Sequence, residues 1–299
     1  MTSNDNTRSA PSSLDALPPL REIIAQHGLD AHKALGQHFL LDLNLTRKIA
    51  AAAGDLAGHA VFEIGPGPGG LTRALLGTSA SKVVTIEKDR RCVEVLQSLK
   101  DAAQGRLEII EADALEADLT ALAPAPRAIV ANLPYNVGTP MLLNWLRRLA
   151  QDPPDATPPA FSSLTLMFQA EVAERLTAAP RSKAYGRLSV IAQHVCKIER
   201  VMTLPARAFT PPPKIDSAVV RLTPRRDRPA HVAFESLEKI TAAAFGQRRK
   251  MLRSSLKPLG GEDLLRSARI APNLRAEDLS VEEFEKLASL HPQPHPPES

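Results

Sequence analysis

From residue 60 onward, short apolar runs alternate with stretches of helical pattern, and this alternation constrains the fold more than any other feature. The apolar runs are rich in branched aliphatic residues and predict buried strands at 60–65, 82–89, 107–113, 127–135 and 162–169. The intervening segments favour helices at 69–77, 90–100, 139–150 and 170–178. Such alternation predicts an α/β fold, a parallel sheet with helices on both faces.

The remainder of the chain predicts a second, helical part. The segment 188–204 is long enough for two more strands, so we expect the sheet to end near residue 204. Prolines punctuate 204–229 and exclude a regular helix, and 209–219 is interpreted as a rigid connector between domains. We therefore expect a tail and helix at 1–30, an α/β domain at 31–204, a helical domain at 205–290 and a disordered tail at 291–299.

Composition restricts the cellular context. An apolar fraction of 43% and a charged fraction of 23% are typical of a soluble globular protein. Cys92 and Cys196 are too few for a disulfide framework or a zinc cluster, so free thiols in a reducing compartment and no metal site are expected. The sequence contains no apolar window of membrane-spanning length and no signal-peptide pattern. These features predict a cytoplasmic protein with no membrane partner.

The charge is unevenly distributed. Residues 1–202 contain 21 basic and 21 acidic residues, whereas 203–299 contain 16 and 12. Within 225–269 there are 11 basic and 5 acidic residues, an excess of six positive charges. A basic segment of this kind suits a polyanion, although a solvated charged face would have the same composition.

A glycine loop follows the first predicted strand. Gly65, Gly67 and Gly70 satisfy G-x-G-x-x-G, which allows a sharp turn and close approach of backbone to a ligand. Glu87, at the end of the second strand, can accept both hydroxyls of a ribose, and Asp113, at the end of the third, can accept an adenine amine. This pattern leaves a methyl donor, a nicotinamide dinucleotide and a structural loop open. Glu63 favours the methyl donor, because a carboxylate beside the loop suits a cationic amino-acid ligand better than a pyrophosphate.

The fourth predicted strand ends in Asn132, Leu133, Pro134 and Tyr135. The exocyclic amine of adenine is a poor nucleophile, but two hydrogen-bond acceptors would localise its lone pair. The Asn132 side-chain oxygen and the Leu133 carbonyl can be those acceptors, because Pro134 disfavours helical angles at Leu133. Tyr135 offers a flat face for a base that has left its stack. An Asn-Pro turn with a buried Tyr is the alternative, but ligands bind at this edge of such a sheet.

Taken together, the motifs resemble those of the small-subunit (16S) ribosomal RNA adenine N6,N6-dimethyltransferases, the KsgA/RsmA type. The resemblance spans about Lys33 to Leu290 and rests on nine stretches: "LGQHFL" (35–40), "EIGPGPGGLT" (63–72), "IEKD" (86–89), "EADAL" (111–115), "NLPYN" (132–136), "MFQAEVAERL" (167–176), "YGRLSV" (185–190), "FTPPPKIDSAVVRL" (209–222) and "FGQRRKMLRSSL" (245–256). It implies a Rossmann-like class I S-adenosylmethionine-dependent methyltransferase sheet with a smaller α-helical C-terminal domain.

The resemblance also implies residue roles. The S-adenosylmethionine contacts would be His38, Leu40, Gly65, Glu87, Asp113 and Asn132. At His38, members of the family often have Asn, which can also form hydrogen bonds. Phe168 would stack on the target adenine opposite Tyr135, although a buried core position is the alternative. The catalytic set is then Asn132, Leu133, Pro134, Tyr135 and Phe168.

The implied substrate is two adjacent adenines in a hairpin near the 3′ end of 16S RNA, within the small (30S) subunit or its precursor. This fits the basic C-terminal part, whose candidate phosphate contacts are Arg225, Arg226, Arg248, Arg249, Lys250, Arg253 and Lys257, with Arg228 in the same cluster. The five basic residues between 246 and 257 are expected to lie within two to three turns of one helix. A monomer is expected.

Three alternatives stay open at this stage. A macrolide-resistance type enzyme, which methylates large-subunit RNA, shares the catalytic loop. A non-catalytic RNA-binding assembly factor would not need Asn132. A nicotinamide-dependent oxidoreductase would bind NAD and not S-adenosylmethionine.

Overall fold

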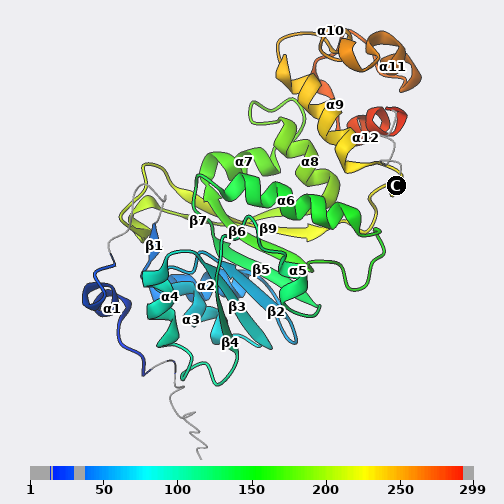
Figure 1. Ribbon diagram of the computed structural model, residues 1–299. Helices are drawn as coiled ribbons and strands as arrows, with labels where there is room; N and C mark the ends of the chain where they lie inside the picture. Colours follow the sequence, from blue (N-terminus) through cyan, green and yellow to red (C-terminus); the bar gives the residue numbers. More distant parts are fainter. Residues whose placement is uncertain (1–13, 15, 30–37, 292–299) are drawn as a thin grey trace, which may run out of the picture.

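The computed structural model describes residue 14, residues 16–29 and residues 38–291 (Figure 1). The disordered tails expected at the two ends fall almost entirely outside these residues. Residues 35–37 of the "LGQHFL" stretch also lie outside them.

Seven strands form one sheet in the order β4-β3-β2-β5-β6-β9-β7. Their bounds are β2 (Ala60–Ile64), β3 (Lys82–Glu87), β4 (Leu107–Glu111), β5 (Arg127–Asn132), β6 (Ser163–Gln169), β7 (Cys196–Leu204) and β9 (Ser217–Pro224). β2 to β6 pair in parallel, and β9 runs antiparallel between β6 and β7. This confirms the predicted α/β class and the Rossmann-like sheet.

Helices cover both faces of the sheet, because alternate residues of each buried strand point to opposite sides (Figure 1). Val61, Val83 and Val130 face α2 (Leu43–Ala52), α3 (Gly70–Leu76) and α4 (Arg90–Gln97). The residues of opposite parity face α5 (Leu119–Leu122), α6 (Gly138–Gln151), α7 (Ala170–Thr177) and α8 (Arg187–Val195). The short helix α1 (Leu20–Gln26) packs through Ile23 against α4.

The C-terminal part has a hydrophobic core of its own. It consists of α9 (Phe234–Gly246), α10 (Leu252–Ser255), α11 (Gly261–Ser267) and α12 (Val281–Leu290), with the 3-10 turns η3 (Lys257–Leu259) and η4 (Ala276–Asp278). Leu237, Leu265 and Phe284 are fully buried there, and Tyr185 and Val190 join them from beside and within α8. A smaller helical part therefore packs on the end of the α/β part, as expected (Figure 1).

The expectation that the sheet ends near residue 204 is wrong. β9 pairs with β6 and β7, and its residues Ser217 to Val220 are buried, so the boundary expected between 204 and 205 lies inside the sheet. The segment 188–204 is also not two strands, since its first half is α8. The helix begins after Gly186, whose N–H donates to Ser189 Oγ at 3.0 Å, and its β-branched residues pack on core atoms of both parts. Tertiary packing overrides local strand preference here.

The proline-rich segment has a different place from the one predicted. It lies between β7 and β9, two strands of the same sheet, so it does not connect the two parts. It contains η2 (Ala206–Ala208) and β8 (Phe209–Thr210), and β8 pairs antiparallel with β1 (Phe39–Leu40). The segment thus holds β1 beside the main sheet through this strand pairing. In the described part of the chain, no helix is long and apolar enough to span a bilayer.

Arg228 lies in the link between β9 and α9 and is buried against the end of α6. Only 7% of its surface is exposed, and its guanidinium donates hydrogen bonds to the carbonyls of Leu149 (3.1 Å), Ala150 (3.3 Å) and Asp152. These carbonyls lie at the C-terminal end of α6, where a helix leaves acceptors without internal partners. Arg228 therefore caps α6 from the segment that follows β9.

We expect Arg228→Ala to lower the free energy of unfolding by about 2–3 kcal/mol, because it leaves buried acceptors without a charged donor. Arg226→Ala is the matched control: Arg226 is exposed, and its bonds to the Ala156 carbonyl (3.0 Å) and Thr157 Oγ1 (3.1 Å) lie at the surface. The control should lose under about 1 kcal/mol. Denaturant unfolding measures both, and equal losses would contradict the capping role.

Candidate functional site

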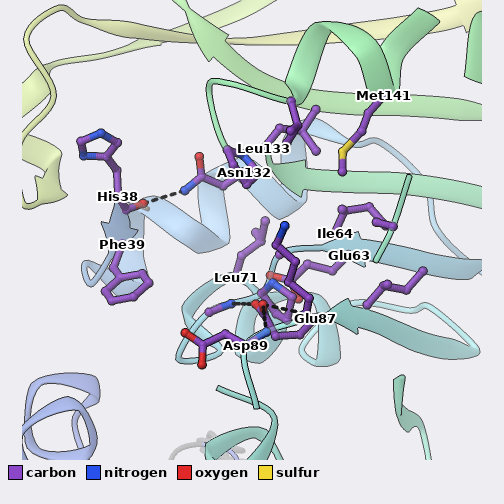
Figure 2. A pocket seen from close by; sticks show the side chains of 18 of the residues that line it. His38, Phe39, Glu63, Ile64, Leu71, Glu87, Asp89, Asn132, Leu133 and Met141 are labelled. Atoms are coloured by element: carbon purple, nitrogen blue, oxygen red, sulfur yellow. Dashed lines mark hydrogen bonds between the residues drawn. The ribbon is translucent and has the colours of Figure 1, made fainter. Parts of the chain in front are cut away.

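A pocket opens at the carboxyl ends of β2, β3, β4 and β5, where the strand order reverses between β2 and β5. Parallel α/β sheets bind ligands at such a reversal. Nine residues predicted from the sequence line it together: His38, Leu40, Gly65, Glu87, Asp113, Asn132, Leu133, Pro134 and Tyr135. Figure 2 shows Glu63 and Glu87 on one side of this pocket and Asn132 and Leu133 on the other.

The glycine loop brings its backbone close to two other segments, the end of β3 and β1. Gly65, at φ 65°, donates its N–H to the Ile86 carbonyl at 3.0 Å. A Cβ on Gly70 would collide with the Leu40 carbonyl oxygen, so only glycine permits β1 to lie against the start of α3. The loop therefore lines the pocket and is also a packing site for β1.

Glu87 is held in place by backbone donors. Its carboxylate accepts hydrogen bonds from the N–H groups of Gly67 (3.2 Å), Lys88 (2.9 Å) and Asp89 (2.9 Å), and 6% of its surface is exposed. Burial nevertheless raises the pKa of this carboxyl, and the backbone donors oppose the rise. A carboxylate has about four lone-pair sites, so acceptor capacity is left for a ligand hydroxyl.

Glu63 is the most deeply buried acid of the pocket. It is 1% exposed, and Thr72 on α3 donates its hydroxyl to Oε2 at 2.6 Å. Burial is the main reason that the pKa of Glu63 is raised to about 8, with the nearby Glu87 charge acting in the same direction. Its side chain is on the same face of the sheet as Glu87, because Glu63 pairs with Thr85 in register.

The orientation of the Asn132 amide is set by His38, the residue directly before β1. Its Nδ2 donates to the His38 backbone carbonyl at 2.9 Å, as Figure 2 shows. The amide nitrogen is thereby engaged, and Oδ1 is left as the group available to a ligand. The carbonyl of Leu133 likewise accepts no hydrogen bond from the described residues, while its side chain is 2% exposed and packs in the core.

Tyr135 is held on two sides. Its hydroxyl lies 2.7 Å from Ser217 Oγ on β9, and its ring centroid lies 5.2 Å from that of His38. His38 is itself held by a 2.7 Å hydrogen bond between its Nδ1 and the Pro211 carbonyl. The proline-rich segment thus holds His38 directly, and β9 and His38 hold Tyr135.

One predicted residue, Phe168, does not line the pocket, and another, Asp113, lines it while bonded to protein neighbours. Phe168 is 4% exposed and belongs to the core, outside the pocket lining, with its ring 3.2 Å from the position that a Cβ on Gly138 would take. Its stacking on a base stays a prediction, and it requires the core around it to open. Asp113 lines the pocket with its side chain partly exposed, accepts from the Leu115 N–H at 2.9 Å and lies 3.8 Å from the Lys88 ammonium.

Sequence reasoning missed the apolar part of the lining. Phe39, Leu71 and Met141 face the pocket, from β1, α3 and α6. A signal existed for Phe39, which lies in the "LGQHFL" stretch between two predicted contact residues, and for Leu71, which lies in the "EIGPGPGGLT" stretch.

The basic residues do not share one helix. α9 ends at Gly246, residues 247–251 form a turn, and α10 begins at Leu252, so the expected two to three continuous helical turns are wrong. Arg248 is engaged by Glu277 at 2.9 Å and by the Lys183 carbonyl at 3.0 Å. The residues that project outward are Arg249, Lys250, Arg253 and Lys257, all exposed.

The cluster around Arg225 is mostly occupied by protein. Arg225 pairs with Asp227 at 3.0 Å and donates to the Gln193 carbonyl at 3.1 Å. Arg226 ties the loop after α6 through Ala156 and Thr157, as described above. Phosphate binding by these two side chains stays a prediction, and it would compete with existing contacts.

Comparisons with known proteins agree on one family. The model of the family described as "Ribosomal RNA adenine dimethylase" matches residues 28–291. A protein of Rhizobium etli named ribosomal RNA small subunit methyltransferase A is 57% identical over 279 residues, covering 93% of this chain and 99% of that protein. The protein of the same name from Paramagnetospirillum magneticum is 58% identical over 273 residues, covering 91% and 94%.

Solved structures are similar over most of the chain. A dimethyladenosine transferase from Plasmodium falciparum has a TM-score of 0.68 at 26% identity, covering 84% of this chain and 96% of that one. The 23S rRNA methyltransferase ErmE has a TM-score of 0.62 at 27% identity, covering 83% and 97%.

The buried Glu63 generates a prediction about stability. Because the pKa of Glu63 is raised on folding, its neutral carboxyl favours the folded state. This contribution to stability is fully present below pH 4.5, the pKa of the group in the unfolded chain, and is lost as pH rises through about 8. Glu63→Gln does not titrate but keeps an acceptor for Thr72. Between about pH 5 and 8 the variant should therefore lose less stability than the wild type, by up to about 1.4 kcal/mol per pH unit.

Denaturant unfolding at a series of pH values measures this difference. Glu116→Gln is the control, because Glu116 is an exposed acid near the rim of the same pocket. Its curve should run parallel to that of the wild type. A parallel curve for Glu63→Gln as well would refute the assignment of this pH dependence to Glu63.

Proposed function

This chain belongs to the ribosomal RNA adenine dimethylase family, and we propose that it dimethylates the N6 amines of two adjacent adenosines near the 3′ end of 16S RNA, using S-adenosylmethionine. The observation that supports this most directly is the meeting of the glycine loop, Glu87 and Asn132-Leu133-Pro134-Tyr135 in one pocket. The first two elements suit a nucleoside with an amino-acid tail, and the third suits an amine on a flat base.

The residues present fit the methyl donor. When bound, S-adenosylmethionine supplies a methyl group on a positively charged sulfur. Glu87 is positioned by three backbone donors to accept ribose hydroxyls, and Asp113 lies at the end of the adjacent strand, where an adenine amine would reach it. His38 and Leu40 approach from β1, and their positions depend on the packing of β1 against the glycine loop.

Asn132 and Leu133 would activate the target amine. The Asn132 amide nitrogen is engaged by the His38 carbonyl, so Oδ1 would be the acceptor for the amine. The Leu133 carbonyl, free of hydrogen bonds from the described residues, is the second acceptor. Two acceptors on one amine localise its lone pair toward the reacting carbon, and alignment supplies much of the rate enhancement. No strong general base is required.

Tyr135 would form the stacking platform for the flipped base. Its ring is fixed by Ser217 and His38, so little side-chain freedom is lost when a base stacks on it. Base stacking on an aromatic ring contributes about 1–3 kcal/mol. Phe168 would contact the other face of the base only after the core at Gly138 loosens.

The choice of small-subunit RNA rests on similarity. Relatives at 57% and 58% identity are named ribosomal RNA small subunit methyltransferase A, whereas the 23S rRNA methyltransferase is 27% identical. We extend the proposal to the hairpin within the 30S subunit or its precursor as substrate, to a monomeric enzyme, and to action in the cytoplasm. The helical C-terminal part, beginning after β9, would hold the particle.

Asn132→Ala should lower the rate of methylation by at least about 100-fold, because an amine acceptor in the pocket is lost. Asn144→Ala, an exposed Asn on α6, is the matched control and should keep wild-type activity. The measurement is mass spectrometry of dimethyladenosine in both ribosomal RNAs from a deletion strain carrying each variant.

Four outcomes of that experiment separate the alternatives. Dimethyladenosine missing only from the small-subunit RNA supports the proposal. Its loss from the large-subunit RNA alone would establish the macrolide-resistance type. Full modification by Asn132→Ala would contradict the amine-acceptor role, and no change on deletion would favour an assembly factor.

The triple variant Arg249→Ala, Lys250→Ala, Arg253→Ala should bind small-subunit particles more weakly. These exposed cations follow α9 and are free to meet phosphates, and no ion pair within the described residues engages them. The slope of log affinity against log salt should become shallower by roughly 2–3, about 0.7–0.9 per cation. Lys100→Ala, an exposed cation on the α/β part, should leave the slope unchanged, and an unchanged slope in the triple variant would exclude phosphate contact.

A further inference from the structure

Two carboxyl groups are buried side by side in the donor pocket. Glu63 on β2 and Glu87 on β3 are 1% and 6% exposed, and both line the pocket. Because Glu63 pairs with Thr85, Glu87 is its diagonal neighbour on the same face of the sheet, a separation of about 7–8 Å between such positions. Figure 2 shows the two side chains on the same side of the pocket.

The two acids differ in how their charge is compensated. Glu87 accepts three backbone hydrogen bonds, which favour its ionised form. Glu63 accepts the Thr72 hydroxyl and has no ion-pair partner among the described residues. An ionised carboxylate in this position therefore lacks a countercharge until a cation enters the pocket.

The other charged or titratable groups around Glu63 do not supply that countercharge. Arg73, next to Thr72 on α3, donates instead to the Pro18 carbonyl at 2.8 Å, and Lys88 lies 3.8 Å from Asp113. The remaining titratable groups that line the pocket are His38, Asp89 and Tyr135. His38 is engaged by Pro211, and Asp89 pairs with Arg91 at 2.6 Å.

The donor and its product differ by one charge at the reacting atom. S-adenosylmethionine carries a positive sulfonium, and S-adenosylhomocysteine, left after methyl transfer, carries a neutral thioether. Both carry the same α-amino and carboxyl groups. A buried acid that is protonated in the empty pocket can lose its proton to solvent when a cationic ligand arrives, and has less reason to do so for a neutral one.

We propose that Glu63 is a specificity-determining residue that couples donor binding to proton release, so that the pocket prefers the cationic donor over its neutral product increasingly as pH rises. Donor binding converts the Glu63 carboxyl to a carboxylate, and the proton passes to the buffer. After methyl transfer the pocket no longer holds the sulfonium charge, so the carboxylate recovers a proton, which weakens the preference for retaining product. This inference rests on the proposed use of S-adenosylmethionine.

The test is calorimetric titration of the full chain with S-adenosylmethionine and with S-adenosylhomocysteine from about pH 6.5 to 9. The ratio of the product Kd to the donor Kd should rise by up to about tenfold per pH unit below pH 8 and then level off. At pH 7, titrations in two buffers of different ionisation heat should show release of close to one proton with the donor and much less with the product. The buffer comparison uses the wild-type protein alone, so it does not depend on whether a variant folds.

Three variants assign the effect to this carboxyl. Glu63→Gln should have a ratio nearly independent of pH. Thr72→Val removes the hydroxyl that favours the ionised form, so its rise should move to higher pH. Glu116→Gln should behave as the wild type, since that acid is exposed.

A wild-type ratio that stays flat, or equal proton release with both ligands, would overturn the inference while leaving the proposed function intact. A rise that persists unchanged in Glu63→Gln would also overturn it, because another group would then be responsible. Binding of neither ligand would overturn the proposed function, and this inference with it.

Discussion

The parallel pairing of β2 with β5 is the contact on which the site depends. Ala60, Val61 and Phe62 lie opposite Arg127, Ala128 and Ile129, and the chain order of the strands reverses at this pair. The connections that follow the two strands therefore run to opposite faces, α3 on one side and α6 on the other. The space left between them at the carboxyl ends is where the glycine loop and Asn132 meet.

A second constraint comes from outside the parallel strands. β1 is only two residues long, yet it is held by pairing with β8 and by close approach to Gly70. His38 directly precedes β1: its carbonyl orients the Asn132 amide, and its ring supports Tyr135. Residues 94 positions apart in the chain thus determine which atom of Asn132 faces a ligand. Substitutions in the proline-rich segment should therefore shift His38 and, with it, the Asn132 amide.

The pocket also retains groups that oppose folding. Burial raises the pKa of both Glu63 and Glu87, and at neutral pH the folded protein favours a neutral Glu63 carboxyl that the unfolded chain would ionise. Core positions of a sheet are normally apolar, and carboxyl groups there are expected only where a ligand needs them. The basic residues differ from one another: Arg225, Arg228 and Arg248 have protein partners, whereas Arg249, Lys250 and Arg253 are exposed.

The sequence by itself determined the α/β class, the first five strands of the main sheet along the chain and nine of the residues that line the pocket. It could do so because strand periodicity is local, and because residues at the carboxyl ends of parallel strands must gather at one edge. Predictions for the later part of the chain were wrong. α8 was expected as strand, β9 was not predicted because prolines precede it, and the basic run was expected as one helix. Tertiary structure alone decided these, since pairing of β9 with β6 and packing of α8 on two cores are long-range contacts. It also decided which Asn132 atom faces the pocket, that Phe168 is buried and that Glu63 lacks a countercharge, because each depends on neighbours far away in the chain.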